Sequence, residues 1–411
     1  MGRRLFSLAW LAVFLAGFAL HEGVAQVPVP VDSAWKVVSE VRARFCPDRR
    51  VDLFEISVDT VGDTLVLTGE TTNRAAHAAL VQHLSRLLPG GKLRDRVVVL
   101  PDSSVAAQSW ALVNVSVANQ RREPSHGAEL LNQMLLGTPL RIYKKRSPWW
   151  FFVRSEEGYL GWTDDGGIWL TDSLGIAAWR ERPRVIVLAK ETEVLSEPRE
   201  HAVPVSDVVV GDILALRGKE NGWLRVALPD GRTGWLREKE ATSFRDFLRQ
   251  ANPSPEQIVH DALQFTGRPY LWGGKSSKEM DCSGYTSVVF RMNGVLLPRD
   301  ANMQAEVGAE VPLDSAFSAL QPGDLVFFGP RPDRITHVGI YIGNKSYIHS
   351  DSHIHVNSFD PQAPNFSPYR LRMFRRARRI LGHLRRDPHT GWLLPEGMRP
   401  PGLFGEAIQL N

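Results

Sequence analysis

Cysteine is scarce in this sequence, and Cys46 and Cys282 are the only two among its 411 residues. At most one disulfide can therefore form, and Cys282 has no second cysteine near it in the chain. The histidines that follow Cys282 are too far along the chain to match the ligand spacing of a structural zinc site. We expect neither a metal ion nor another cofactor.

Long apolar runs are also scarce, and the one candidate spans residues 5–20, directly after Arg3 and Arg4. The small residues Gly23-Val24-Ala25 follow it, so the N-terminus has the three parts of a secretory signal peptide, with cleavage expected after Ala25. The run is short for a membrane-spanning helix, although a retained N-terminal anchor is the alternative. There is no cysteine near the expected cleavage site, so the protein is not expected to be a lipoprotein. We expect an exported protein, periplasmic or secreted, without a stable membrane anchor.

The chain lacks a strong charge imbalance, since Lys and Arg total 49, Asp and Glu total 45, and the sequence pI is about 9.1. In an exported protein this mild basic excess fits an anionic envelope polymer better than a nucleic acid. One basic segment is either a wall- or membrane-surface patch or a final strand and helix turn with solvated arginines. Its arginines are Arg370, Arg372, Arg375, Arg376, Arg378, Arg379, Arg385 and Arg386.

A chain of 411 residues with a hydrophobic content of 43% is too long for a single core and is expected to form several globular domains. Residues 27–105 are predicted to form a helix, two strands, a helix and a strand. This αββαβ order resembles the small BON-like envelope domains, and no catalytic group is evident in it. The predicted elements are a helix over 33–45, strands over 53–58 and 64–69, a helix over 74–88 and a strand over 96–100.

An internal repeat follows, with an offset of about 73 residues. A Gly-led strand, a tryptophan after a turn and a Gly-x-x-Gly-Trp strand end occur twice, ending at Trp162 and Trp235. This pattern predicts two bacterial SH3-like barrels, over residues 108–176 and 182–242. A linker over 243–253 leads to a final domain over 254–382, and residues 383–411 are expected to be a loosely packed or disordered tail.

Cys282 lies where an irregular Gly- and Pro-containing segment gives way to a predicted helix. The first-turn amides and the helix dipole favour a thiolate, so we expect a lowered thiol pKa and a nucleophilic cysteine. The alternative is a small buried hydrophobic residue. We predict that Cys46 and Cys282 stay unpaired, because a disulfide would consume the candidate nucleophile and the two lie in different predicted domains.

Two histidines downstream, His337 and His349, lie on adjacent predicted strands. If Gly343-Asn344-Lys345 is the connecting loop, His349 pairs with Gly339 and the two histidines share one face. Cys282 would then attack an amide carbonyl, His337 would act as the base and His349 would orient it. Tyr270 is a candidate donor to the oxyanion. His353 and His355 are expected on the exposed face of the next strand.

The final domain contains, in order, five short motifs: Tyr270-x-Trp-Gly-Gly, Asp281-Cys-Ser-Gly, Leu297-Pro-Arg-Asp, Gln321-Pro-Gly-Asp-Leu and Thr336-His-Val-Gly-Ile-Tyr. With these motifs it resembles the NlpC family of papain-like cell-wall cysteine peptidases. The resemblance implies that Cys282 is the nucleophile, His337 the base and His349 the third residue. It also implies a multidomain α+β protein whose papain-like α+β catalytic domain follows the αββαβ domain and two SH3-like β-barrels.

The domain order further resembles the γ-D-glutamyl-L-diamino acid endopeptidases, in which the first barrel closes one end of the cleft. The resemblance implies that Glu129, Tyr159 and Asp281 bind the free ammonium of an N-terminal L-Ala, as charge-assisted bonding to a buried cation requires. Ser283 would bind the free carboxylate of D-Glu. Relatives often have serine where this chain has Ala301, which puts one carboxylate contact in question. For Glu129, a charge on a surface helix is the alternative.

The sequence therefore predicts an exported cysteine peptidase that hydrolyses the bond between γ-D-Glu and the L-diamino acid of peptidoglycan stem peptides with a free N-terminal L-Ala. The expected partners are such peptides, and the protein is expected to be a monomer. An endopeptidase or amidase acting on intact peptidoglycan would use the same three catalytic residues. A non-catalytic wall-binding protein is the alternative outside the enzymes.

Overall fold

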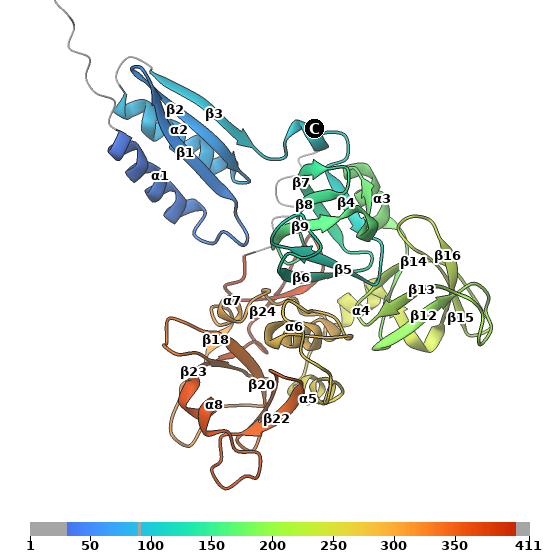
Figure 1. The fold of residues 1–411 in the computed structure, drawn as a ribbon. Coiled ribbons are helices and arrows are strands. Elements are labelled where there is room, and N and C mark those ends of the chain that lie inside the picture. The colour runs from blue at the N-terminus through green and yellow to red at the C-terminus, as the bar shows by residue number, and fades with distance from the viewer. Residues whose placement is uncertain (1–30, 89–91, 400–411) are drawn as a thin grey trace, which may run out of the picture.

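The computed structural model describes residues 31–88 and 92–399. The predicted signal peptide, residues 1–25, lies outside these residues. The chain forms a multidomain α+β protein, as expected, with an N-terminal αββαβ domain, two β-barrels and a C-terminal α+β domain (Figure 1). Within the described residues, no helix is both long and apolar enough to cross a bilayer.

The N-terminal domain has the predicted αββαβ order. Strands β1 and β2 pair antiparallel and β2 and β3 pair parallel, and the helices pack on the sheet to form a separate core. The side chain of Asn73 caps α2 by accepting the N–H of Ala76 at 2.9 Å, which explains where this helix begins. The elements are α1 (Val31–Phe45), β1 (Phe54–Val61), β2 (Thr64–Thr71), α2 (Arg74–Leu87) and β3 (Leu93–Val99).

The predicted repeat forms two seven-stranded sheets. When β4–β10 are matched in order with β11–β17, the two sheets have the same strand order, which confirms the duplication. The first barrel contains β4 (Trp110–Val113), β5 (Val117–Arg121), β6 (Leu130–Leu135), β7 (Pro139–Ser147), β8 (Trp150–Arg154), β9 (Leu160–Asp164) and β10 (Ile168–Thr171), followed by α3 (Ser173–Glu181). The second contains β11 (Arg184–Val187), β12 (Glu191–Leu195), β13 (Pro204–Val209), β14 (Ile213–Glu220), β15 (Trp223–Ala227), β16 (Thr233–Arg237) and β17 (Ala241–Ser243).

The C-terminal domain packs helix α6 against strands β20 and β21 of a six-stranded sheet, whose order is β18-β23-β19-β20-β21-β22. Six of the eight arginines of the basic segment lie in α8 and β23, and most of the eight are half-buried rather than solvated. The elements are α4 (Phe244–Gln250), α5 (Pro255–Leu263), α6 (Cys282–Met292), α7 (Ala301–Gln304), β18 (Ala309–Glu310), β19 (Leu325–Phe328), β20 (His337–Gly343), β21 (Ser346–Ser350), β22 (Ile354–Ser358), α8 (Pro368–Met373) and β23 (Phe374–Arg379).

The expectation of a loose tail over 383–411 is wrong for its described part. Residues up to 399 form β24 (Leu384–Arg386) and β25 (Leu393–Pro395), and the Trp392 side chain is only 1% exposed. The indole Nε1 of Trp392 donates to Oε1 of Glu156 at 3.0 Å, and its ring packs against Phe244. The segment lacks periodicity because its apolar residues pack in a buried cluster shared between domains rather than along one face of an element.

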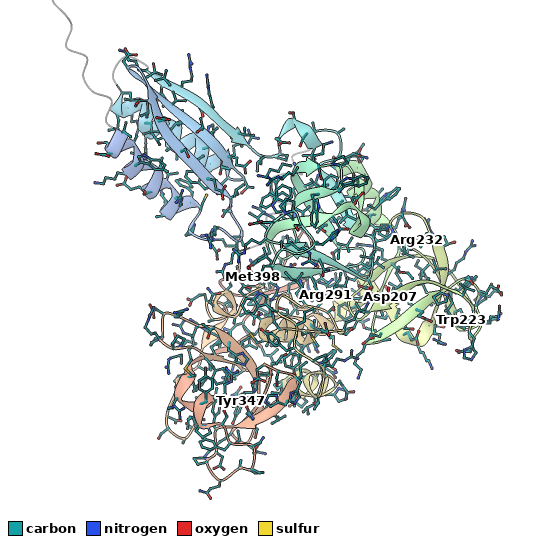
Figure 2. The ribbon with its side chains drawn as sticks, viewed as in Figure 1. Asp207, Trp223, Arg232, Arg291, Tyr347 and Met398 are labelled. Carbon is teal, nitrogen blue, oxygen red and sulfur yellow. The ribbon has the colours of Figure 1, made fainter. Side chains whose placement is uncertain are left out.

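The first barrel contacts the catalytic domain through buried ion pairs. Arg291 of α6 donates to Glu156 of the barrel at 2.7 Å and to the carbonyl of Gly211 in the second barrel, at the centre of the molecule (Figure 2). Lys275 pairs with Glu157 nearby. Removing one partner of such a buried pair would leave an uncompensated charge, so these pairs fix how the barrels sit on the catalytic domain.

Candidate active site

Helix α6 begins at Cys282, as the sequence predicts. Asp281 precedes it and caps the helix, because its Oδ1 accepts the N–H of Gly284 at 2.7 Å. The first turn of α6 is buried, and Cys282 borders a cleft. Cys282 and Cys46 are both free thiols, which confirms that they do not pair. The local sequence therefore holds one cysteine at a buried helix N-terminus that faces an open cleft.

The predicted register of the two histidine strands is confirmed. His349 of β21 lies opposite Gly339 of β20, so His337 and His349 share one face. Nε2 of His337 lies 3.0 Å from Nδ1 of His349, and both rings are buried. His353 is exposed, as expected, and directly precedes β22. The expectation of an exposed face is wrong for His355, because this residue lies opposite His349 and is half-buried, with its ring centroid 4.6 Å from that of His349.

Asn357 of β22 decides the tautomer of both histidines. Its amide Nδ2 donates to the carbonyls of Val356 and Asn365, so its Oδ1 is the atom that faces Nε2 of His349, at 3.0 Å. Nε2 of His349 therefore carries the proton, and Nδ1 accepts a hydrogen bond from Nε2–H of His337. This leaves Nδ1 of His337 as the nitrogen that can take a proton from the thiol.

The expected lowering of the Cys282 pKa is not found. Burial raises the pKa of this thiol to about 12, although the backbone N–H groups of Val338 and Ser283 act in the opposite direction. Burial also lowers the pKa of His337 well below its ordinary value, and that of His349 to about 4. Desolvation outweighs the helix N-terminus here, so burial favours the neutral forms of the thiol and of the imidazole.

A cleft of about 1010 Å³ opens in front of Cys282. It is lined by the catalytic domain, the first barrel and the N-terminal domain. Six of the eight residues predicted for the site line it, and the other two, His337 and His349, are not among its lining residues. The six are Glu129, Tyr159, Tyr270, Asp281, Cys282 and Ser283.

Glu129 lies at the edge of the cleft, on the loop that precedes β6 rather than on a helix. Its Oε2 accepts a hydrogen bond from Nε of Arg122 at 2.6 Å, and its Oε1 accepts one from Nε1 of Trp272 at 3.0 Å. These bonds lower the pKa of Glu129, so the side chain is a carboxylate. Each oxygen keeps acceptor capacity toward the cleft.

The approach of the first barrel requires glycine in the Trp-Gly-Gly motif. Gly273 has a φ of +79°, and a Cβ there would lie 2.3 Å from the carbonyl oxygen of Leu130 at the start of β6. Because Leu130 follows Glu129, this contact sets the position of Glu129 beside the catalytic domain. The motif therefore serves the junction between two domains.

Tyr159 points its hydroxyl at a carboxylate that the sequence analysis did not single out. Its O–H donates to Oδ2 of Asp300 at 3.0 Å, which leaves the phenol oxygen free to accept a hydrogen bond from a ligand. Burial and Asp300 raise the pKa of Tyr159, so the phenol stays protonated. Asp300 directly precedes α7 and lines the same cleft.

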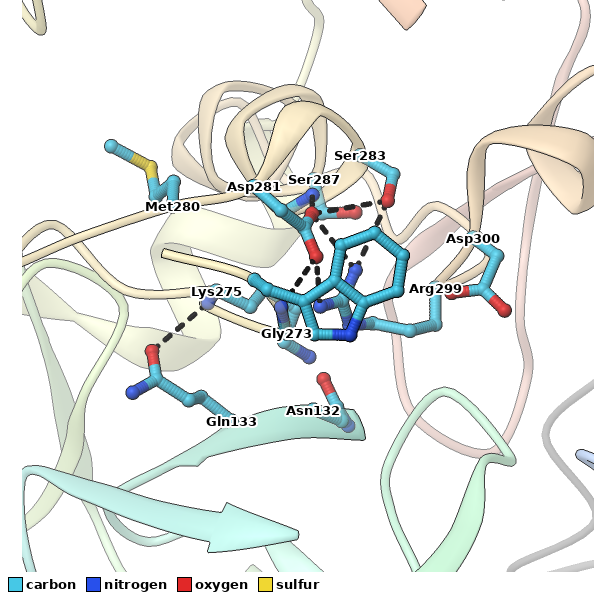
Figure 3. A network of polar contacts seen from close by, with 12 residues as sticks. Asn132, Gln133, Gly273, Lys275, Met280, Asp281, Ser283, Ser287, Arg299 and Asp300 are labelled. Carbon is cyan, nitrogen blue, oxygen red and sulfur yellow. Dashed lines mark hydrogen bonds and ion pairs between the residues drawn. The ribbon is translucent and has the colours of Figure 1, made fainter. Parts of the chain in front are cut away.

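Asp281 is more heavily bonded than a ligand for an ammonium group would be. Its Oδ1 accepts from Ser283, Gly284 and Arg299, and its Oδ2 accepts from Gly273 and Arg299 (Figure 3). Five donors already exceed the roughly four lone-pair sites of a carboxylate. The predicted role of Asp281 as a direct ammonium ligand is therefore disfavoured, and this residue builds the start of α6.

Ser283 belongs to the same network. Its hydroxyl donates to Asp281 at 3.2 Å and accepts from Nη1 of Arg299 at 3.0 Å. A hydrogen bond from Ser283 to a substrate carboxylate would have to replace the bond to Asp281. Tyr270 is freer to act, because burial raises the pKa of its phenol and keeps the O–H donor beside Cys282.

Three possible metal ligands lie beside the histidine pair. The ligand atoms of His349, Asp351 and His355 are within 4.8 Å of one another. Nδ1 of His349 already bonds to His337, and Nη2 of Arg370 donates to Asp351 at 3.1 Å. A cation would have to displace both bonds, so the arrangement favours an orienting histidine over a metal ligand.

The residues that sequence reasoning missed had usable signals. Asn357 lies two positions after His355, which is opposite His349, so the strand period places it on the histidine face. Arg299 and Asp300 were part of a recognised motif, but their partners lie far away in the chain. Only the fold brings Asp300 to Tyr159.

Comparisons with known proteins agree with this geometry. Residues 267–375 match the NlpC/P60 family, and residues 121–166 match the bacterial dipeptidyl-peptidase Sh3 domain. The protein is therefore a cysteine peptidase in which SH3-like domains precede a papain-like catalytic domain. That catalytic domain belongs to the NlpC/P60 family.

Relatives extend the match across several domains. Dipeptidyl-peptidase 6 of Lysinibacillus sphaericus is 29% identical over 263 residues, which are 62% of this chain and 93% of that protein. A gamma-D-glutamyl-L-lysine dipeptidyl-peptidase of Bacillus cereus is 28% identical over 264 residues, 62% of this chain and 77% of its own. The crystal structure of an NlpC/P60 family protein from Bacillus cereus covers 66% of this chain and 100% of its own at 24% identity, with a TM-score of 0.58, which shows a shared fold.

Proposed function

We propose that the protein is an exported cysteine peptidase that hydrolyses the bond between γ-D-Glu and the L-diamino acid of peptidoglycan stem peptides carrying a free N-terminal L-Ala. One observation carries the proposal most directly. Glu129 and Tyr159 of the first barrel line the same cleft as Cys282. In this proposal they close one end of the cleft with an anionic carboxylate and a hydrogen-bond acceptor.

The catalytic steps follow from the tautomers. Sγ of Cys282 attacks the carbonyl carbon while its proton moves to Nδ1 of His337, and the N–H of Cys282 and the hydroxyl of Tyr270 face the oxyanion. His337 then donates that proton to the leaving amine as the C–N bond breaks. Water attacks the thioester, His337 takes its proton, and the acid product leaves as the thiol is restored. His349 and Asn357 hold the ring of His337 throughout.

The closed end supports a substrate with a free amine. An ammonium needs acceptors, and Glu129 and Tyr159 both keep acceptor capacity toward the cleft. A glycan or an acyl group on that nitrogen would remove the charge and add bulk against the barrel. The printed name of the Bacillus cereus relative, a gamma-D-glutamyl-L-lysine dipeptidyl-peptidase, supports the same bond. The signal-peptide pattern of residues 1–25 supports export.

The direct test is product analysis by mass spectrometry with the tripeptide L-Ala-γ-D-Glu-L-Lys and its diaminopimelate counterpart. We expect release of L-Ala-γ-D-Glu by the full protein. The matched control is Cys282→Ala, which removes the nucleophile alone and should abolish release. Absence of the dipeptide with the wild-type protein, or its release by Cys282→Ala, would refute the proposal.

A further inference from the structure

The N-terminal αββαβ domain contributes to the catalytic cleft. The loop between α1 and β1 extends toward the junction of the first barrel and α7 (Figure 1). Several of its residues line the cleft together with Glu129, Tyr159 and Cys282. They include Cys46, Asp48, Arg50 and Asp52.

Arg50 is the centre of this contact. Its Nη1 donates to Oδ2 of Asp300 at 2.7 Å and to Oδ1 of Asn302 at 2.8 Å, so it contacts the residues on both sides of Ala301. Its Nε and Nη2 bond to Asp48 of the same loop. Such a planar, doubly bonded guanidinium has one orientation, which a flexible surface arginine would not have.

The backbone of the loop is fixed as well. The carbonyl of Arg50 accepts the N–H of Leu160 at 2.7 Å, directly after Tyr159, and Nη2 of the buried Arg154 donates to the carbonyl of Val51 at 2.8 Å. Leu53 packs against a buried cluster that belongs mainly to the first barrel. The loop is therefore attached both to the barrel and to the catalytic domain.

Arg50 and Tyr159 meet at one atom, because Oδ2 of Asp300 accepts from both. Asp300 is thereby held between a guanidinium and a phenol, and the direction of the Tyr159 hydroxyl depends on it. Loss of the guanidinium would leave Asp300 with one partner and free to rotate. Tyr159 would then lose the orientation that turns its acceptor lone pairs toward the cleft.

We propose that residues 46–53 form a third wall of the active-site cleft and that Arg50 is a positioning residue, which acts through Asp300 and Tyr159 on the amino end of the substrate. This inference rests on the proposed function. It gives the αββαβ domain a role in substrate selection, with peptides whose first residue has a free amine as the selected class.

The test is a double-mutant cycle on the full chain with Arg50→Ala, Tyr159→Phe and the double variant. Arg50→Ala should raise KM for the free-amine tripeptide about tenfold, as expected for a charge-assisted contact, with kcat within about twofold. In the Tyr159→Phe background, Arg50→Ala should raise KM by less than about twofold. Arg50→Lys, which keeps the charge and one contact, should give an intermediate KM. Arg96→Ala removes an exposed arginine from the same domain and should leave KM unchanged.

Binding gives a second readout. In the Cys282→Ala background, calorimetry with the intact tripeptide should show weaker binding when Arg50 is replaced. A wild-type KM for Arg50→Ala and Arg50→Lys, or equal effects with and without the Tyr159 hydroxyl, would overturn the inference while leaving the proposed function standing. Failure of the wild-type protein to release the dipeptide would instead remove the proposed function.

Discussion

At the scale of single residues, the side chain that governs the chemistry is Asn357. Its amide is fixed by two backbone carbonyls, so it presents an acceptor to His349. Because of that bond, His349 carries its proton on Nε2, and its Nδ1 accepts a hydrogen bond from Nε2–H of His337. Nδ1 of His337 is then the basic nitrogen. We therefore propose a catalytic unit of four residues, Cys282, His337, His349 and Asn357, in which Asn357 fixes the protonation pattern of the two histidines.

Replacing Asn357 tests this chain. Asn357→Ala removes the acceptor, so His349 can change tautomer and the orientation of His337 is lost. We expect kcat to fall by a factor on the order of 10–100, less than the roughly 10²–10⁴-fold contribution of a general base because His337 itself remains, with little change in KM. Asn357→Asp keeps an acceptor and should retain more activity. Steady-state kinetics of both variants provide the measurement, and equal activity of Asn357→Ala and wild type would contradict the assignment.

Residue-level prediction worked where the chemistry is local. Cys282, His337 and His349 could be found because each lies in a recognisable motif or on a strand of known period. The pKa of Cys282 could not, because burial is a property of the packed molecule and outweighs the helix N-terminus. The bonding of Asp281 was missed for the same reason, since Arg299 closes on it only in the fold.

At the scale of elements, the hairpin of β24 and β25 is the feature that could not be predicted from the sequence. Trp392, Leu393 and Leu394 have no period, because they pack between domains instead of along one face. The register of the strands that carry the histidine pair was predictable from their alternation. The expected loop was one residue too long, because Gly343 ends β20 opposite Ser346 with a bulge and only Asn344 and Lys345 form the turn. Strands with a regular hydrophobic alternation were therefore predicted from the sequence. The hairpin of β24 and β25, which is ordered by packing against neighbouring domains, was not.

Trp392 provides the test at this scale. Trp392→Phe keeps an aromatic ring but removes the N–H that donates to the buried Glu156. We expect a loss of about 1–3 kcal/mol in the free energy of unfolding, the cost of leaving a buried polar atom without its partner. Urea denaturation provides the measurement, and Trp169→Phe, at a tryptophan that is 47% exposed, is the control and should change stability by less than about 0.5 kcal/mol. Equal stability of the two variants would contradict the packing described for the C-terminal segment.

At the scale of the whole molecule, the domain order could be predicted, and the family resemblance also placed the first barrel at the cleft, where Glu129 and Tyr159 are found. The contact of the N-terminal domain could not be predicted. The two barrels follow from an internal repeat, and the catalytic domain follows from its motifs. The contact between Arg50 and Asp300 joins residues 250 positions apart, and no periodicity or motif relates them. The cleft is lined by three domains, and the part contributed by the N-terminal domain is visible only in the folded chain.

The central claim is that this closed end selects a free N-terminal amine. The most direct measurement compares two stem tripeptides that differ only in acetylation of L-Ala, with mass spectrometry of the products from the wild-type protein. The account predicts release of the dipeptide from the free-amine peptide and a loss of at least about a hundredfold in kcat/KM for the acetylated one, as for a missing charge-assisted contact plus a steric clash. Equal cleavage of the two peptides would contradict it.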